Sequence, residues 1–203
     1  MSPAGATVAA VPTTDFATKP TLTGSRVVLR PFTPVDVDAM GPVLADPDVI
    51  RFTGSAHSTA EVDAARPVLD DATRRWYETR AEQTDRLDLA IVDRATDSCV
   101  GEAVLNDWEP ANQSCNFRIL IGPEGRDRGL GSEATRLVLD HAFTTTDLYR
   151  IELGVYAFNP RARRVYERAG FVVEGFRRAG LVFDGERVDE VTMSVLRPEW
   201  ERR

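Results

Sequence analysis

A glycine-rich turn flanked by arginines is the part of this 203-residue sequence best suited to bind phosphates. Residues 126–131 read Arg-Asp-Arg-Gly-Leu-Gly, follow a short apolar run and lead into a helical pattern from Leu130. Backbone N–H groups at a helix start can donate to a pyrophosphate, and the helix dipole favours negative charge there. The two glycines remove side chains that would hold phosphates away. A helix start with a solvated arginine pair is the alternative interpretation.

Two further candidates follow one strand later. Asn159 precedes Pro160 at the start of another helical segment, where it is a typical N-cap with proline at the first helical position. Tyr166 lies on the apolar face of that helix with Ala162, and an aromatic residue at such spacing is usually part of the core. From these residues alone, both have a sufficient structural explanation.

Glu102 is the candidate base, because an acid in the middle of the apolar run 99–105 is unusual. It could deprotonate an amine directly or through water, but it could equally be an edge-facing charge or an ion-pair partner. Asn116, at the head of the next strand, could line the same cleft. A structural role is favoured for His141, which lies on the predicted helix 130–143, and His57 lies in a loop with no identifiable partners.

The elements that must position these residues are predicted from periodicity. Three sequential strands joined by polar turns indicate an antiparallel meander, and a βαβ unit follows it. A first strand and two helices precede the meander; the second helix is capped by Ser58 or Thr59, reaches about Arg80 and is interrupted or kinked at Pro67. The predicted strands cover residues 25–30, 87–92, 99–105, 117–121, 149–156, 171–173 and 187–196, and the predicted helices 33–45, 58–80, 130–143 and 160–169.

Composition limits the function classes. The net charge is −7, with 42% hydrophobic and 28% charged residues, which is typical of a globular protein and disfavours nucleic acid and anionic membranes as partners. Arginines nevertheless cluster at 126–128 and 161–164, which suits a small anionic ligand. Residues 1–20 lack a basic start and a long apolar core, so we expect a flexible tail before a single domain over 21–203. No apolar run reaches membrane-spanning length. A cytoplasmic location is therefore expected.

The two cysteines do not form a disulfide framework of the kind found in secreted domains. Cys99 and Cys115 could face each other across a hairpin near Asp107, although buried thiols are the favoured interpretation. Neither histidine lies near a cysteine, so no zinc site is predicted, and we expect no metal.

A dinucleotide site is the first alternative to weigh, because residues 129–134 satisfy its glycine fingerprint. In that fold the first glycine directly follows the first strand, whereas here residues 122–128 intervene and three strands precede. The second strand also lacks a terminal acid. A nicotinamide cofactor is therefore disfavoured, and no Gly-Lys-Ser/Thr follows to make a nucleoside-triphosphate P-loop.

The two motifs together resemble the acetyl-CoA-binding core of the GNAT N-acetyltransferase superfamily. Its Arg/Gln-x-x-Gly-x-Gly/Ala signature is matched by residues 126–131, and its downstream Asn, small residue, Tyr and Gly-Phe by Asn159, Ala162, Tyr166 and 170–171. The ending, from Glu174 to Trp200, is similar to the branch of ribosomal-protein N-terminal acetyltransferases. The resemblance implies an α/β fold with a mixed, mostly antiparallel sheet, a central splayed strand pair and helices on both faces.

The resemblance also implies direct acetyl transfer from acetyl-CoA to a primary amine. Tyr166 would protonate the departing thiolate, and a backbone N–H of residues 119–121 would hold the developing oxyanion. The implied cofactor-binding residues are Ile119, Leu120, Ile121, Arg126, Arg128, Gly129, Leu130, Gly131, Ser132, Asn159 and Ala162. Glu102 and Asn116, as candidate base and candidate acceptor contact, rest on their positions in the strands and not on the resemblance.

The sequence leaves the acceptor open among a protein N-terminus, a polyamine, an aminoglycoside-like antibiotic and an amino acid. An α-amine with a pKa of about 8 needs less help from a base than a lysine near 10.4, which slightly favours an amine of low pKa. An acyl-CoA-binding regulatory module without turnover is the alternative from another class. Assembly as a homodimer is also left open.

Overall fold

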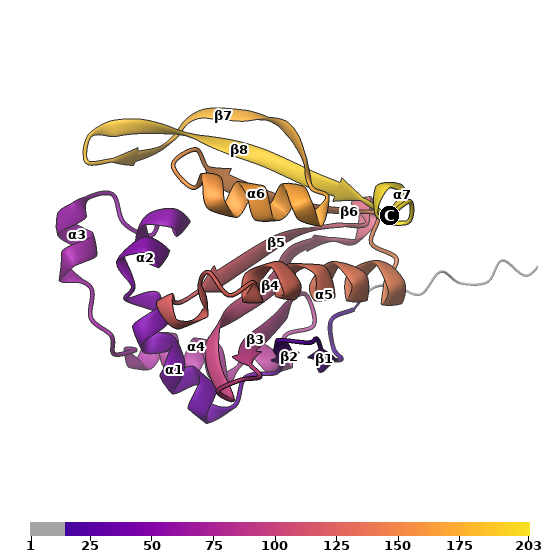
Figure 1. Cartoon of the computed structure of the whole chain (residues 1–203), viewed down its shortest axis with the longest axis horizontal. Helices are drawn as coiled ribbons and strands as arrows, with labels where there is room; N and C mark the ends of the chain where they lie inside the picture. The colour runs from indigo at the N-terminus through magenta and orange to yellow at the C-terminus, as the bar shows by residue number, and fades with distance from the viewer. Residues whose placement is uncertain (1–14) are drawn as a thin grey trace, which may run out of the picture.

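The protein, a computed structural model that describes residues 15–203, is built around an eight-stranded sheet with helices on both faces (Figure 1). The strands are β1 (Leu22–Thr23), β2 (Val27–Arg30), β3 (Leu87–Asp93), β4 (Ser98–Glu109), β5 (Ser114–Ile121), β6 (Arg150–Tyr156), β7 (Val172–Phe183) and β8 (Glu186–Leu196). The helices are α1 (Pro34–Leu44), α2 (Pro47–Thr53), α3 (Thr59–Ala64), α4 (Asp71–Glu78), α5 (Leu130–Thr145), α6 (Pro160–Ala169) and α7 (Arg197–Trp200), and the 3-10 turns are η1 (Arg80–Glu82), η2 (Pro110–Asn112) and η3 (Pro123–Gly125).

The sheet is divided at its centre by the β5–β6 pair. The strand order is β1-β2-β3-β4-β5-β6-β8-β7, and every neighbouring pair is antiparallel except β5–β6. The parallel register runs only from Ser114↔Arg150 to Asn116↔Glu152. Beyond Asn116, β5 stays paired with β4, and β6 stays paired with β8. This mixed, mostly antiparallel sheet with a splayed central pair confirms the predicted fold class.

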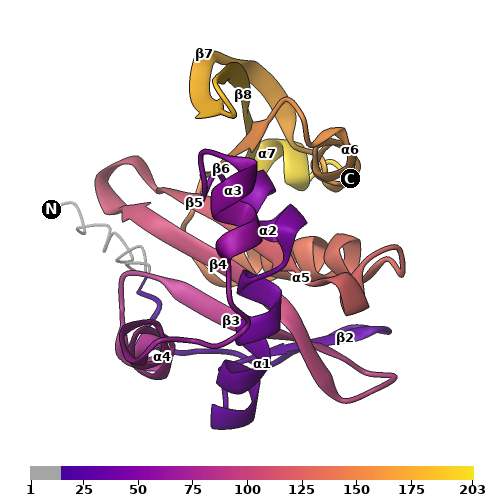
Figure 2. The ribbon, with the colours of Figure 1, turned by 90° about the vertical axis from the view of Figure 1, so that its left-hand side faces the viewer.

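Alternation along β5 separates the two faces of the sheet. Phe117 and Ile119 pack into the core beneath α5 and α6, whereas Leu120 packs with Met40 of α1 and Tyr77 of α4. Figure 2 shows α1, α2 and α3 following one another up the side nearest the viewer, with α4 beside β3. Each face therefore has its own helices and its own apolar core.

The first helix ends before Asp46 as predicted, because α1 stops at Leu44. The short helix α2 that follows was not predicted. The Asp46 side chain accepts from Val49 N at 2.9 Å, Pro47 begins this helix and Gly54 ends it at φ 68°. The long helix expected to reach Arg80 is two short ones, α3 and α4. Ser58 caps α3 as expected, and Asp70 caps α4 separately.

The alternative in which the two cysteines face each other across a hairpin is wrong, whereas the favoured interpretation as unpaired thiols holds, with Cys115 buried and Cys99 partly buried. The β4–β5 register pairs Leu105 with Phe117 and Asn106 with Asn116, while Cys99 lies near the other end of β4 and pairs with Val92 of β3. Both thiols are free. Burial raises the pKa of Cys99 to about 11, so this thiol stays protonated near neutral pH.

Most of the expected N-terminal tail lies outside the described residues, but its last part packs on the domain. Phe16 is only 2% exposed and belongs to the main core, and the Lys19 ammonium donates to Gln83 O at 2.6 Å. Within residues 15–203, no helix has both the length and the apolar character needed to cross a membrane.

Candidate functional site

The edge of β5 that faces β6 presents backbone groups suited to an extended ligand. Gly122 N donates to Val100 O of β4 at 2.8 Å, so Leu120 and Arg118, two and four residues earlier, also turn their backbone groups toward β4. The residues between them, Ile119 and Ile121, therefore turn theirs toward β6. Since the β5–β6 register ends at Asn116, these two are the backbone candidates for a bound pantetheine arm, while Leu120 remains a candidate through its side chain only.

The start of α5 is the segment for which phosphate binding is predicted. Gly129 occupies the N-cap with φ 78°, and no side chain of residues 15–203 caps the helix, so the first N–H groups, those of Leu130, Gly131 and Ser132, are available to a ligand. A Cβ on Gly131 would lie 3.4 Å from Ile121 Cγ1, which shows how closely the helix start approaches the end of β5. The start of α5 and the open edge of β5 are therefore continuous, and they fit the pyrophosphate and arm of coenzyme A.

The arginines of the turn have partners within the protein. Arg126 pairs with Asp46 and, at 3.1 Å, with Asp48, and it donates from Nε to Ile121 O at 3.1 Å. Arg128 pairs with Asp93 at 2.6 Å. These ion pairs anchor the turn to α2 and β3. Contact of either arginine with phosphate stays a prediction, and it would require the guanidinium to bind its aspartate and the phosphate at the same time.

The α6 segment has the local structure that the sequence predicted. Asn159 Oδ1 accepts from Ala162 N at 3.0 Å, which confirms the N-cap, and Gly170 ends the helix at φ 90°. Contact of Asn159 or Ala162 with the cofactor is a separate hypothesis that these hydrogen bonds do not test.

Tyr166 of α6 lies near the point where β5 and β6 diverge. Its ring meets Phe117, the first β5 residue beyond the parallel register, edge to face at 6.4 Å between centroids, and Phe171 at 5.9 Å. The side chain is buried, and burial raises the pKa of Tyr166 to about 12. The phenol is therefore protonated throughout the neutral range and can act only as a proton donor.

Glu102 lies on the opposite face of the sheet, in the centre of β4. It pairs in register with Leu120 and is 1% exposed, which rules out an edge-facing charge. Arg118 Nη2 is 2.9 Å from Oε1, and Oε2 has no hydrogen-bond partner among residues 15–203. Burial raises the pKa of Glu102, and the charge of Arg118 partly offsets this effect. Such a carboxylate is suited to accept a proton.

A pocket of about 200 Å³ adjoins Glu102 between the sheet and the N-terminal helices. One carboxylate, one guanidinium, three hydroxyl side chains, two large aromatics and four aliphatic side chains line it: Leu44, Val49, Ile50, Thr53, Ser55, Thr73, Trp76, Tyr77, Glu102, Arg118 and Leu120. Tyr77 is 3% exposed, and its pKa is raised by burial first and by the charge of Glu102 second.

Sequence reasoning missed most of this pocket. The adjacent aromatics Trp76 and Tyr77 are the one signal that could have indicated it, because they stand in an otherwise polar segment.

Asn116 lies where β5 and β6 diverge, and its side-chain amide donates to Asn106 Oδ1 at 3.0 Å. By strand alternation it shares the face of Arg118 and Glu102. Among the described residues, no group of three or more His, Cys, Asp or Glu could hold a metal ion.

Comparison with known proteins gives one consistent result. A family model described as an acetyltransferase (GNAT) domain matches residues 26–172. Spermidine N(1)-acetyltransferase of Vibrio cholerae is 28% identical over 141 residues, which cover 63% of this chain and 82% of that protein. The Bacillus subtilis protein named "Putative ribosomal N-acetyltransferase YdaF" is 32% identical over 104 residues, covering 51% of this chain and 57% of its own.

Solved structures agree at the level of the fold. The spermidine N-acetyltransferase of Vibrio cholerae in complex with CoA and spermine aligns with a TM-score of 0.75 at 22% identity, covering 88% of this chain and 99% of that one. A GNAT-family acetyltransferase from Bacillus anthracis aligns with a TM-score of 0.72 at 20% identity, covering 88% and 99%.

Proposed function

Because this chain belongs to the acetyltransferase (GNAT) family, we propose that it acetylates a single amine held in the pocket beside Glu102, with Tyr166 as the acid on the opposite face. Family membership confirms what the two motifs predicted: an acetyl-CoA-dependent N-acetyltransferase. The residue roles and the kind of amine are our proposal. The cytoplasmic location and a homodimer stay predictions.

The observation that carries this proposal is the position of Glu102 and Tyr166 on opposite faces of the divided sheet. Glu102 lines a pocket under the N-terminal helices, and Tyr166 packs against Phe117 beneath α6. Acceptor and donor would thus approach from opposite sides and meet where β5 and β6 separate. Acetyl-CoA supplies the activated acyl group as a thioester.

Each residue then has one task in a balanced transfer. The amine nitrogen forms the new C–N bond as the thioester C–S bond breaks, and Glu102 accepts the proton that nitrogen loses, directly or through water. Tyr166 donates its phenolic proton to the departing sulfur. Ile119 or Ile121 could donate a backbone N–H to the carbonyl oxygen as negative charge develops on it.

The lining of the pocket favours an acceptor with one amine. Glu102 is its single carboxylate, and Arg118 already pairs with it. The two acids nearest in the chain to the pocket residues of α2, Asp46 and Asp48, are paired with Arg126. A polyamine carries several separated cations and would need several free carboxylates, so a peptide N-terminus or a small monoamine fits better. Spermidine is the second candidate, because the Vibrio cholerae relative is named for it.

The test combines an acceptor panel with one substitution. Peptide N-termini, small monoamines and spermidine would be compared by the release of free thiol from acetyl-CoA. We expect Tyr166→Phe to keep coenzyme A affinity while turnover on the best amine falls about ten- to a hundredfold, the usual range for losing a general acid. Unchanged turnover would make Tyr166 a packing residue. Cofactor binding without turnover on any amine would favour the regulatory module.

A further inference from the structure

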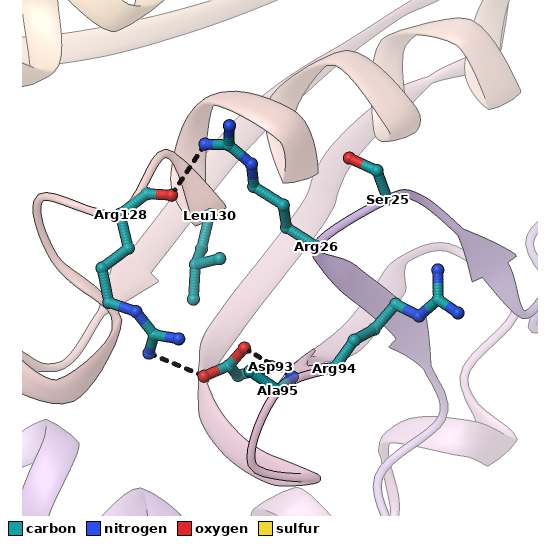
Figure 3. A pocket seen from close by; sticks show the side chains of 7 residues that line it. All are labelled: Ser25, Arg26, Asp93, Arg94, Ala95, Arg128 and Leu130. Atoms are coloured by element: carbon teal, nitrogen blue, oxygen red, sulfur yellow. Dashed lines mark hydrogen bonds and ion pairs between the residues drawn. The ribbon is translucent and has the colours of Figure 1, made fainter.

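A second pocket, of about 400 Å³, lies on the other side of the phosphate-binding turn (Figure 3). It opens between the β1–β2 turn, the β3–β4 turn and the start of α5. Its lining residues are Ser25, Arg26, Asp93, Arg94, Ala95, Arg128 and Leu130. Three arginines and one aspartate thus line it, and only Arg128 is paired with the Asp93 carboxylate.

The single carboxylate of this pocket is fully used by the protein. Asp93 pairs with Arg128 at 2.6 Å and accepts from Ala95 N at 3.0 Å (Figure 3). It also accepts from Thr96 Oγ1 at 3.2 Å. Its side chain is only 2% exposed. The positive charge of Arg128 is therefore balanced, and Asp93 has little capacity left for the other two arginines.

Arg26 and Arg94 bind neutral partners instead. Arg26 Nη1 donates to the carbonyl oxygen of Arg128 at 3.0 Å, and Arg94 Nη1 donates to that of Gly24 at 2.7 Å. Glu133, the next acid, accepts from the backbone N–H groups of residues 25–27 and from the Ser25 hydroxyl. Over residues 15–203, neither Arg26 nor Arg94 takes part in an ion pair. Two cations consequently remain without a counter-charge in one concave site.

We propose that this pocket binds a phosphomonoester, and that the group it binds is the 3′-phosphate of coenzyme A. The inference rests on the use of acetyl-CoA, and it is independent of the roles proposed for Glu102 and Tyr166. Two guanidiniums match the double charge and three acceptor oxygens of a phosphomonoester better than the singly charged phosphates of a pyrophosphate diester. The pocket also shares Arg128 and Leu130 with the turn that faces the pyrophosphate, and these groups lie close together in coenzyme A. A separate phosphate compound would use the same chemistry.

Arg94 is the residue to test, because Arg26 also supports the turn through the Arg128 carbonyl. Coenzyme A and dephospho-coenzyme A would be titrated by calorimetry into the full chain and into Arg94→Ala. We expect the wild-type protein to bind coenzyme A roughly tenfold more tightly, and Arg94→Ala to lose that preference while keeping its affinity for dephospho-coenzyme A. Arg187→Ala removes the same charge from the exposed β7–β8 hairpin and should change neither.

A second arm separates the two sources of phosphate. If inorganic phosphate binds to the coenzyme A-saturated protein and Arg94→Ala abolishes that binding, the site holds a separate phosphate compound. The proposal would be overturned if Arg94→Ala lowered the affinities for coenzyme A and dephospho-coenzyme A by the same factor. It would also be overturned if Arg94→Ala changed neither the binding of coenzyme A nor the binding of inorganic phosphate. If Arg94→Ala melts at a lower temperature than the wild type, Arg94→Gln replaces it in both titrations, because glutamine removes the charge but keeps more of the side chain. Failure of acetyl transfer with an intact coenzyme A preference would count against the proposed function alone.

Discussion

The donor half and the acceptor half of the site are built in different ways. The donor half is nearly continuous in sequence, from β5 through α5 and β6 to α6, and it presents backbone groups: the open edge of β5 and the uncapped start of α5. The acceptor half combines α1, α2 and α4 with β4 and β5, and it presents side chains around Glu102. In the proposed mechanism, phosphate recognition depends on local backbone conformation, whereas acceptor recognition depends on which helices pack on the sheet.

Charge is also arranged differently in the two halves. The cations of the phosphate turn have partners: Arg126 pairs with α2 acids, and Arg128 pairs with Asp93. In the acceptor half, Glu102 is paired with one guanidinium, and its Oε2 has no hydrogen-bond partner within the described part of the chain. The first arrangement holds a turn in place, and the second leaves the proposed base, Glu102, able to change its protonation. Substitutions in the two halves should therefore affect different constants.

The largest effect is expected for Glu102→Gln, which removes the base but keeps its size. The rate constant kcat/KM for the amine should fall about 10²- to 10⁴-fold, while the dissociation constant of coenzyme A stays unchanged. Because the pKa of Glu102 is raised, the wild-type base ionises only as pH rises through that value. The kcat/KM of the wild type should therefore increase with pH, and this increase should be absent from the pH profile of Glu102→Gln.

Glu109→Gln is the matched control for that experiment. Glu109 ends the same strand, is exposed and accepts from Asn112 at 2.7 Å. The control should keep both the rate and the pH profile. A Glu102→Gln enzyme with normal turnover would show that Glu102 is a structural ion-pair partner of Arg118, and the proposed base would be lost with it.

The difference between the donor half and the acceptor half explains which parts of the site could be predicted from the sequence. The phosphate turn, α5 and α6 follow from signals next to one another in the chain, such as Gly129, the Asn159 cap and Gly170. The pocket around Glu102 required the β4–β5 register that brings Arg118 beside it, and the packing of α4 that brings Tyr77. No local pattern encodes those contacts.

For α2 and for Arg126, the sequence contained a signal that was too short or too local to give the correct prediction. The start and stop of α2 can be read from Asp46, Pro47 and Gly54, yet the segment between them is too short to show helical periodicity. Arg126 shows the same limit in the site. Its type suggested a phosphate contact, but only the packing of α2 revealed Asp46 and Asp48 as its partners.

An intermediate effect is expected for Gly129→Ala in the donor half. At φ 78° an alanine costs about 1–2 kcal/mol, and its Cβ would lie 2.5 Å from Arg26 Nη1. We expect the dissociation constant of coenzyme A to rise about tenfold as the turn distorts, with little change in KM for the amine. Gly185→Ala is the control, because Gly185 has φ 81° with nothing within 4 Å of its Cβ position. Equal coenzyme A affinity in the two variants would show that the backbone of the turn does not hold the phosphates.

The smallest effect is expected for Asn159→Ala, which tests whether the downstream motif contributes more than helix capping. Loss of the Asn159–Ala162 hydrogen bond should lower the free energy of unfolding by about 1 kcal/mol, a fall of about 2–4 °C in the melting temperature. Asn159→Ser restores a capping oxygen without the amide. If capping is the whole role, serine recovers the melting temperature and both variants bind coenzyme A normally. If the amide also contacts the cofactor, serine recovers stability while its affinity for coenzyme A stays low, and the donor half then includes a side-chain contact beside its backbone groups.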